Sequence, residues 1–186
     1  MRLELSRHPD TPCAAVSSIA VDVKRVGALG LALGYQLVGD VDRLLVPAPA
    51  APERTDELWR HTCFEAFLRP EAQDGPGEAY AEFNFAPSTQ WAAYRFTGYR
   101  EGMAPAPIAA PRIDLARTDA SLGLAVQLNL AGLNLPPGPC RLALSAVIED
   151  SSGAKSYWAL AHPPGRPDFH HRSSFACALP PGDPTA

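Results

Sequence analysis

The sequence lacks the features that mark several large classes of protein. No apolar run reaches the roughly 18 residues that a membrane-spanning helix needs, and the 16 basic residues are scattered along a chain of net charge -4. A nucleic-acid-binding surface is normally basic, so we expect neither a nucleic acid nor a membrane as a partner. The motifs G-x-G-x-x-G, G-x-x-x-x-G-K-[ST] and G-x-S-x-G are absent, which argues against a dinucleotide-binding fold, a P-loop and an α/β-hydrolase.

Cysteine is scarce and dispersed. The four cysteines, Cys13, Cys63, Cys140 and Cys177, form no C-x-x-C pair. The first residues, MRLELSRHPDTP, contain no apolar core of a secretory signal, so we expect a cytoplasmic protein. In that compartment the thiols stay reduced, whereas two disulfides are the alternative for an exported chain.

Helix signals are also few, while turn signals are abundant. The 20 prolines and 14 glycines divide the chain into short segments, many of which alternate apolar and polar residues with the period of two typical of strands. The clearest case is 28–39, where five large apolar residues share one parity. We expect strands at 2–6, 16–26, 28–39, 41–46, 62–69, 78–86, 90–96, 112–116, 121–130, 140–149, 155–160 and 173–179.

These segments predict an all-β fold. A short helix could begin near Thr55 as N-cap, but no helix of 10–12 residues alternates with the strands, which excludes a βαβ layout. About ten short strands and one or two helical turns are typical of an antiparallel β-sandwich, here jelly-roll-like. We expect one domain over residues 1–180 and a flexible tail over 181–186.

Polar and aromatic residues concentrate on three of the predicted strands. By parity Glu65 shares a face with Cys63 and Phe67, Glu82 shares one with Asn84, and Trp91 shares one with Arg95. If the strands are adjacent, Glu65, Glu82, Asn84, Trp91 and Arg95 converge on one sheet surface. Polar groups around a tryptophan suit a sugar, because its hydroxyls need donors and acceptors and its apolar ring face needs an aromatic platform. The alternative is a solvated sheet face with cross-strand ion pairs between Glu65 or Glu82 and Arg95.

The positions of the two other tryptophans can be predicted from the segments that contain them. Trp59, in a polar segment before a strand, either closes one end of the sandwich or forms the mobile side of an aromatic clamp. Trp158 lies in an apolar strand and is expected in the core, which turns Tyr157 toward the opposite and more exposed side.

Metal and catalytic signals are weak. On a strand His170 and His171 would point to opposite faces, and His61-x-Cys63 has no obvious third ligand. A haem would need axial ligands such as His with Met or a second His, and the one internal methionine, Met103, lies in a loop. We therefore expect no metal and no cofactor, with haem or calcium as the alternatives. Glu65 and Glu82 could form the carboxylate pair of a glycosidase, which requires a separation of about 5 Å or 6.5–9.5 Å.

Three stretches together resemble a known family: ELWRHTCFEAFLRP, YAEFNFAPSTQWAAYRF and HPPGRPDFHHRSSFA. They are similar to the bacterial DOMON-like proteins, which are related to family 9 carbohydrate-binding modules. The resemblance implies a β-sandwich that binds a small ligand, usually a sugar held between aromatic rings and, in some relatives, haem. The absence of a secretory signal departs from the secreted modules.

The sequence therefore predicts non-catalytic binding of a small carbohydrate, a mono- or disaccharide or a cell-wall sugar, in a cleft on one sheet face. The predicted binding residues are Trp59, Glu65, Glu82, Asn84, Trp91 and Arg95. The alternatives are a glycoside-processing enzyme that uses Glu65 and Glu82, a haem-binding module and a protein-interaction module. The pattern leaves the oligomeric state open.

Overall fold

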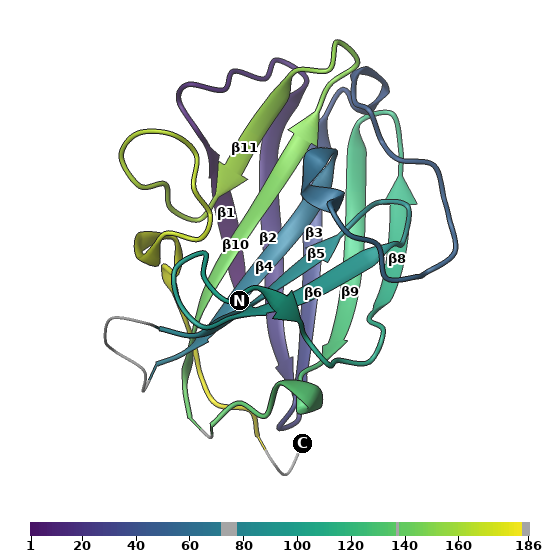
Figure 1. Ribbon diagram of the computed structural model, residues 1–186. Helices are drawn as coiled ribbons and strands as arrows, with labels where there is room; N and C mark the ends of the chain where they lie inside the picture. The colour runs from purple at the N-terminus through teal and green to yellow at the C-terminus, as the bar shows by residue number, and fades with distance from the viewer. Residues whose placement is uncertain (72–77, 137, 184–186) are drawn as a thin grey trace.

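A computed structural model describes residues 1–71, 78–136 and 138–183 (Figure 1). Within these ranges the chain forms twelve strands and four single-turn 3-10 helices, and no helix there has the length and apolar character that crossing a bilayer requires. The elements are β1 (Arg2–Arg7), β2 (Val16–Val26), β3 (Gly30–Gly39), η1 (Val41–Arg43), η2 (Leu58–Arg60), β4 (Cys63–Pro70), β5 (Tyr80–Phe85), β6 (Trp91–Phe96), β7 (Ala104–Pro105), β8 (Arg112–Arg117), β9 (Ser121–Asn129), η3 (Ala131–Leu133), β10 (Cys140–Glu149), β11 (Lys155–Ala159), η4 (Arg172–Ser174) and β12 (Cys177–Leu179).

The strands form one curled antiparallel sheet. Its order is β7-β6-β5-β4-β10-β11-β1-β2-β3-β9-β8, and β12 pairs with β10. Figure 1 shows the half with β2, β3, β8 and β9 lying behind the half with β4, β5, β6 and β10. The predicted antiparallel β-sandwich is therefore confirmed, whereas the predicted tail includes residues 184–186, which lie outside the described residues.

Three local predictions were wrong. The predicted strand 173–179 is a strand only at Cys177–Leu179, because its first residues belong to η4. The segment 41–46 is not a strand, because β3 ends at Gly39 and the chain turns into η1; at Gly39 a Cβ would lie 2.1 Å from the Ala15 carbonyl oxygen. Thr55 is not a helix N-cap either. The helix η2 starts later, after Glu57 in the left-handed region at φ 63°, and the Thr55 hydroxyl instead accepts a hydrogen bond from Gln90 Nε2 at 2.9 Å.

A main apolar core fills the space between the two halves of the sheet. Alternate residues of β2, β3 and β9 meet the alternate residues of β4, β5 and β10 that face them. The Tyr35 and Phe64 rings lie 5.0 Å apart across the core, and the buried Tyr35 hydroxyl donates to the Glu65 carbonyl at 2.8 Å. Each large side chain buried in this way contributes about 1.5–3 kcal/mol to the stability of the fold.

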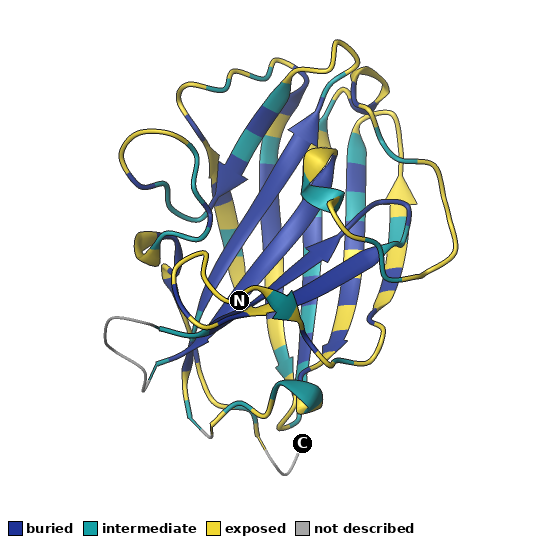
Figure 2. Cartoon of the chain, in the orientation of Figure 1, coloured by how far each residue is buried: buried dark blue, intermediate teal, exposed yellow. Residues whose placement is uncertain are grey.

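The opposite face of the β4–β5–β10 half is also covered. Every residue of β4 and β5 is buried, as the dark blue arrows of Figure 2 show. A second cluster, here named the outer core, packs on this face beneath η2 and the segment between β11 and β12; it comprises Phe67, Tyr80, Ala92, Tyr94, Phe96, Ala143, Val147, Ala159, Phe169 and Phe175. The alternative of a solvated sheet face is thereby wrong for Glu65 and Glu82, which are 3 % and 5 % exposed.

The two-residue strand β7 pairs with only part of the β6 edge, and the segment that leads into η2 covers the part next to Trp91. Arg54 forms an isolated parallel bridge with Trp91, and its guanidinium donates to the carbonyls of Ala93 and Ala106. The same group lies over the rings of Trp91 and Tyr94, at 5.6 and 5.4 Å from their centroids. These contacts place η2, and with it Trp59, above the outer core.

Candidate functional site

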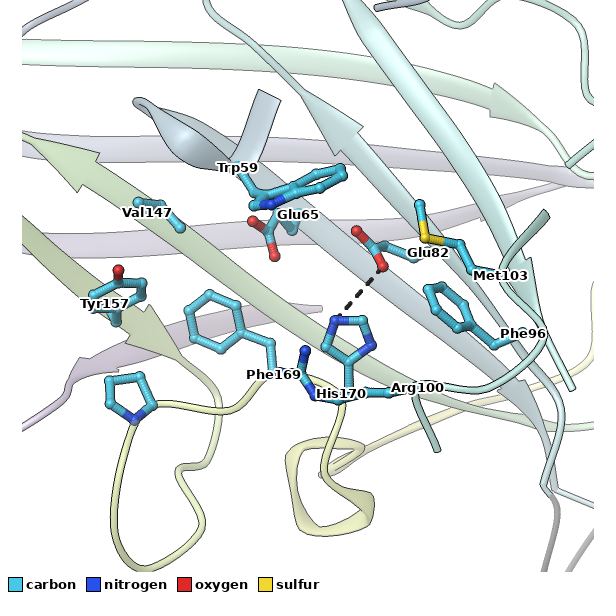
Figure 3. Close-up of a pocket in the computed structure, with 11 residues that line it drawn as sticks. Trp59, Glu65, Glu82, Phe96, Arg100, Met103, Val147, Tyr157, Phe169 and His170 are labelled. Atoms are coloured by element: carbon cyan, nitrogen blue, oxygen red, sulfur yellow. Dashed lines mark ion pairs between the residues drawn. The ribbon is translucent and has the colours of Figure 1, made fainter. Parts of the chain in front are cut away.

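A pocket of about 330 Å³ opens on the outer core. It is here named the acid pocket, because two carboxyl groups lie at its floor (Figure 3). Its lining residues come from η2, five strands (β4, β5, β6, β10 and β11) and two connecting segments, and they are Trp59, Glu65, Glu82, Phe96, Arg100, Met103, Val147, Tyr157, Pro167, Phe169 and His170.

Strand pairing places the two acids together. In the antiparallel β4–β5 pair, Glu65 is opposite Asn84 and Phe67 is opposite Glu82. Glu65 and Glu82 are therefore diagonal neighbours on the same face, at a spacing that long side chains can bridge. The main core occupies the other face of both strands, so the acids can point only toward the acid pocket.

Glu65 has an unused acceptor. Its Oε2 accepts a hydrogen bond from Ser145 Oγ at 3.3 Å, whereas its buried Oε1 has no hydrogen-bond partner among the described residues. Burial raises the pKa of Glu65 well above its ordinary value, and the negative charge of Glu82 raises this pKa further. Both effects favour the uncharged form of Glu65, and its Oε1 is left for a ligand.

Glu82 is held by two neighbours. Asn84 Nδ2 donates to its Oε1 at 2.7 Å, and His170 Nε2 lies 3.8 Å from its Oε2. Burial raises the pKa of Glu82 to about 7, although the Asn84 hydrogen bond and the Arg100 charge both act to lower it. Near neutral pH this group is therefore divided between its acid and its carboxylate.

The histidine beside Glu82 is neutral. Burial, followed by the positive charge of Arg100, lowers the pKa of His170 to about 4. Its Nδ1 lies 2.7 Å from the Tyr80 hydroxyl, which accepts the Arg100 backbone N–H at 3.3 Å. If the Tyr80 hydroxyl donates its hydrogen bond to Nδ1, the histidine carries its proton on Nε2, the nitrogen on the side of Glu82.

Aromatic rings form the walls. Trp59 packs edge-on against Tyr94 with ring centroids 5.8 Å apart, and the Tyr94 hydroxyl donates to Asp56 Oδ1 at 2.6 Å. Figure 3 shows the Trp59 indole beside the Glu65 carboxyl group, with Phe169 and Tyr157 across the pocket. Trp59 is therefore a wall of the acid pocket rather than a plug at the end of the sandwich.

The structure brings together half of the predicted site. Trp59, Glu65 and Glu82 line the acid pocket. Asn84 is fully buried beneath the pocket, and its side-chain amide donates a hydrogen bond to Glu82. Trp158 is in the main core as predicted, and Tyr157, on the opposite face of β11, lines the pocket.

The predicted convergence was wrong for Trp91 and Arg95. Glu82 is opposite Tyr94, and Phe85 is opposite Trp91, because the connection over residues 86–90 has an odd number of residues. Even-numbered residues of β6 therefore share the face of Glu82, and the odd-numbered ones face the other way. Trp91 lies in the main core, and Arg95 is exposed beside a separate hollow at the end of the sandwich.

Sequence reasoning missed the contributions of the connecting segments. Arg100 and Met103 follow β6, and Phe169 and His170 follow β11. Phe169 and His170 both lie in the stretch HPPGRPDFHHRSSFA. Its aromatic and histidine side chains are the signal that could have indicated these two residues.

The histidines form no metal centre within the described ranges. No group of three or more His, Cys, Asp or Glu side chains there could hold a metal ion. His61 Nδ1 is 2.7 Å from Glu149 Oε2, so its partner is an acid on β10 and not Cys63. His171 Nδ1 lies 2.8 Å from Ser173 Oγ in a local turn.

Comparison with solved structures identifies proteins of similar architecture. One is a family 9 carbohydrate-binding module from Caldicellulosiruptor kristjanssonii in complex with glucose, with a TM-score of 0.50 and 8% sequence identity over 95% of this chain and 83% of that chain. The two proteins share a fold. A module of the same family and organism in complex with cellotriose gives a TM-score of 0.48 and 8% identity, over 84% of this chain and 75% of that chain. No family model and no curated protein matches the sequence.

Proposed function

We propose that this chain is a DOMON-like protein, related to the family 9 modules, that binds a mono- or disaccharide in the acid pocket without acting on it. The observation that carries the proposal is the Glu65 carboxyl group, which is buried, lines the pocket and has an oxygen with no hydrogen-bond partner among the described residues. A buried polar atom normally has a partner. A sugar hydroxyl supplies one.

The pocket walls and volume fit the same ligand. A sugar ring has an apolar face that stacks on an indole and a rim of hydroxyls that donate to carboxyl oxygens and accept from N–H groups. The pocket offers Trp59 for stacking on the ring face, and Glu65, Glu82 and His170 for hydrogen bonds to the hydroxyls. Its volume of about 330 Å³ lies at the lower end of the range for small-molecule sites, about 300–1,000 Å³, which favours one or two sugar units.

Isothermal titration calorimetry with a panel of neutral mono- and disaccharides tests the proposal. We expect binding by the parent protein and a loss of about tenfold in affinity in Trp59→Ala, because the stacked ring contributes about 0.5–1.5 kcal/mol beyond its buried area. Glu4→Gln, an exposed acid on β1 in the other half of the sheet, is the matched control and keeps the parent affinity. Absence of any sugar binding by a folded parent protein contradicts the proposal.

The same samples separate binding from catalysis. A non-catalytic pocket returns a bound disaccharide unchanged after prolonged incubation, as carbohydrate chromatography can measure. Release of monosaccharide by the parent protein, lost in Glu65→Gln and in Glu82→Gln, contradicts the non-catalytic part of the proposal and establishes the acid pair as the machinery of a glycosidase.

A further inference from the structure

The floor of the acid pocket holds two acids without a dedicated cation. The positive charge of Arg100 acts on both acids, but its Nη2 donates to Asp168 Oδ1 at 2.8 Å, and His170 is neutral. The charged and titratable groups that surround the two acids from the elements packed on them are Cys63, Tyr80, Tyr94, Arg100, Glu149, Tyr157, Asp168 and His170. Arg100 is the one cation in this set.

The unoccupied acceptors require donors. Glu65 Oε1 has no hydrogen-bond partner among the described residues, and Glu82 Oε2 has only the His170 contact at 3.8 Å. A neutral hydroxyl offers one proton and no charge, so it leaves the pKa values of the two desolvated carboxyl groups raised. An ammonium group offers three donors and a positive charge, and it stabilises both groups as carboxylates.

The aromatic walls also favour a positively charged ligand. Trp59, Tyr157 and Phe169 line the space above the acids, and the faces of such rings attract a cation through their quadrupoles. The rings also stack on a sugar. The occupant that satisfies both the floor and the walls is a sugar with a positive group on its ring.

We propose that the preferred ligand of the acid pocket is an amino sugar, with its protonated amine bound between Glu65 and Glu82. This inference rests on the proposed function, because it names the class of sugar that the same pocket selects. The ammonium charge lowers the pKa of both acids on binding, so the protons that they still hold pass to the buffer, while the amine keeps its three protons and binds as a cation beside two carboxylates. A neutral sugar releases no such protons.

Calorimetric titration with glucosamine, glucose and N-acetylglucosamine tests the inference at about pH 6.5, below the pKa of about 7.7–8.0 typical of an α-amino group. We expect glucosamine to bind at least about tenfold more tightly than glucose, since hydrogen bonds to charged groups contribute about twice as much as neutral ones. N-acetylglucosamine, whose amide carries no charge, loses that preference. Buffers of different ionisation enthalpy should reveal proton release with glucosamine alone.

Two variants locate the effect. Glu65→Gln and Glu82→Gln should each weaken glucosamine binding by a larger factor than glucose binding, and Glu4→Gln should leave the preference for glucosamine unchanged. Equal binding of glucose and glucosamine overturns the amino-sugar inference but leaves the proposed function standing. Binding of a simple alkylammonium ion with no binding of any sugar overturns both, and so does a folded protein that binds none of these compounds.

Discussion

Two titratable side chains that face each other in the acid pocket have pKa values moved in opposite directions. Burial raises the pKa of Glu82 to about 7 and lowers that of His170 to about 4. Each shift favours the neutral form of its group, because burial penalises the charged form. The two groups thus oppose each other in their effect on stability between about pH 4 and pH 7.

Glu82→Gln should change the pH dependence of stability. The neutral form of Glu82 stabilises the fold below the ordinary pKa of 4.5, and this contribution is lost as the pH rises toward about 7. A shift of that size corresponds to about 3 kcal/mol. We expect the variant to exceed the parent in free energy of unfolding by up to this amount at about pH 8 and to match it near pH 4.

Urea unfolding at the two pH values measures this difference. The control Glu4→Gln replaces an exposed acid and should shift stability by little at either pH. If Glu82→Gln changes the free energy of unfolding equally at both pH values, the pKa of Glu82 is not raised in the folded protein.

At the scale of elements, the side chain of Asp168 anchors the segment between β11 and β12. This residue accepts hydrogen bonds from Arg100 Nη2 at 2.8 Å and from the His170 backbone N–H at 3.1 Å, and the Tyr99 hydroxyl also donates to it. One carboxylate therefore joins two connecting segments that both contribute walls to the acid pocket.

Asp168→Ala should loosen those walls without unfolding the sandwich. Loss of the charged acceptor costs about 1–3 kcal/mol, and the main core lies elsewhere. We expect faster amide hydrogen exchange over residues 165–176, measured by mass spectrometry, together with weaker ligand binding. Asp114→Ala, which removes an exposed ion pair with Arg112 on β8, is the control, and unchanged exchange in Asp168→Ala would contradict the anchoring role.

How much of the structure could be predicted from the sequence depends on how far apart in the chain the interacting residues lie. Alternation within a segment depends on neighbours along the chain, so the strands around Glu65, Glu82 and Trp158 were predictable from the sequence. The register across the hairpin depends on the 86–90 connection, which alternation does not reveal, and this is why Trp91 and Arg95 were misplaced. His170 reaches Tyr80 across 90 residues of chain, a contact that no local pattern encodes.

At the scale of the whole molecule, the two-layer architecture buries three of the four cysteines. Cys63, Cys140 and Cys177 are buried, Cys13 is partly exposed, and none of the four is paired in a disulfide. Burial raises the pKa of the Cys63 thiol well above its ordinary value and also raises those of Cys140 and Cys177. Thiolate is the reactive form, so burial and raised pKa together slow the reaction of these three groups.

A thiol reagent should therefore distinguish one cysteine from three. In the native protein at neutral pH we expect prompt reaction of Cys13 and slow reaction of the others. After denaturation without reductant all four should react, because none of them is paired in the structure. Two or fewer reactive thiols in denatured protein, kept from air oxidation, would reveal a disulfide and contradict the structure.

The placement of the three tryptophans has a spectroscopic consequence. Trp91 and Trp158 lie in the main core, and Trp59 lies in the wall of the acid pocket. Emission from the first two should report whether the fold is intact, whereas emission from the third should respond to an occupant of the pocket. Trp59→Phe and the double variant Trp91→Phe/Trp158→Phe would thus divide the intrinsic fluorescence of the chain into a folding signal and a binding signal, without any added dye.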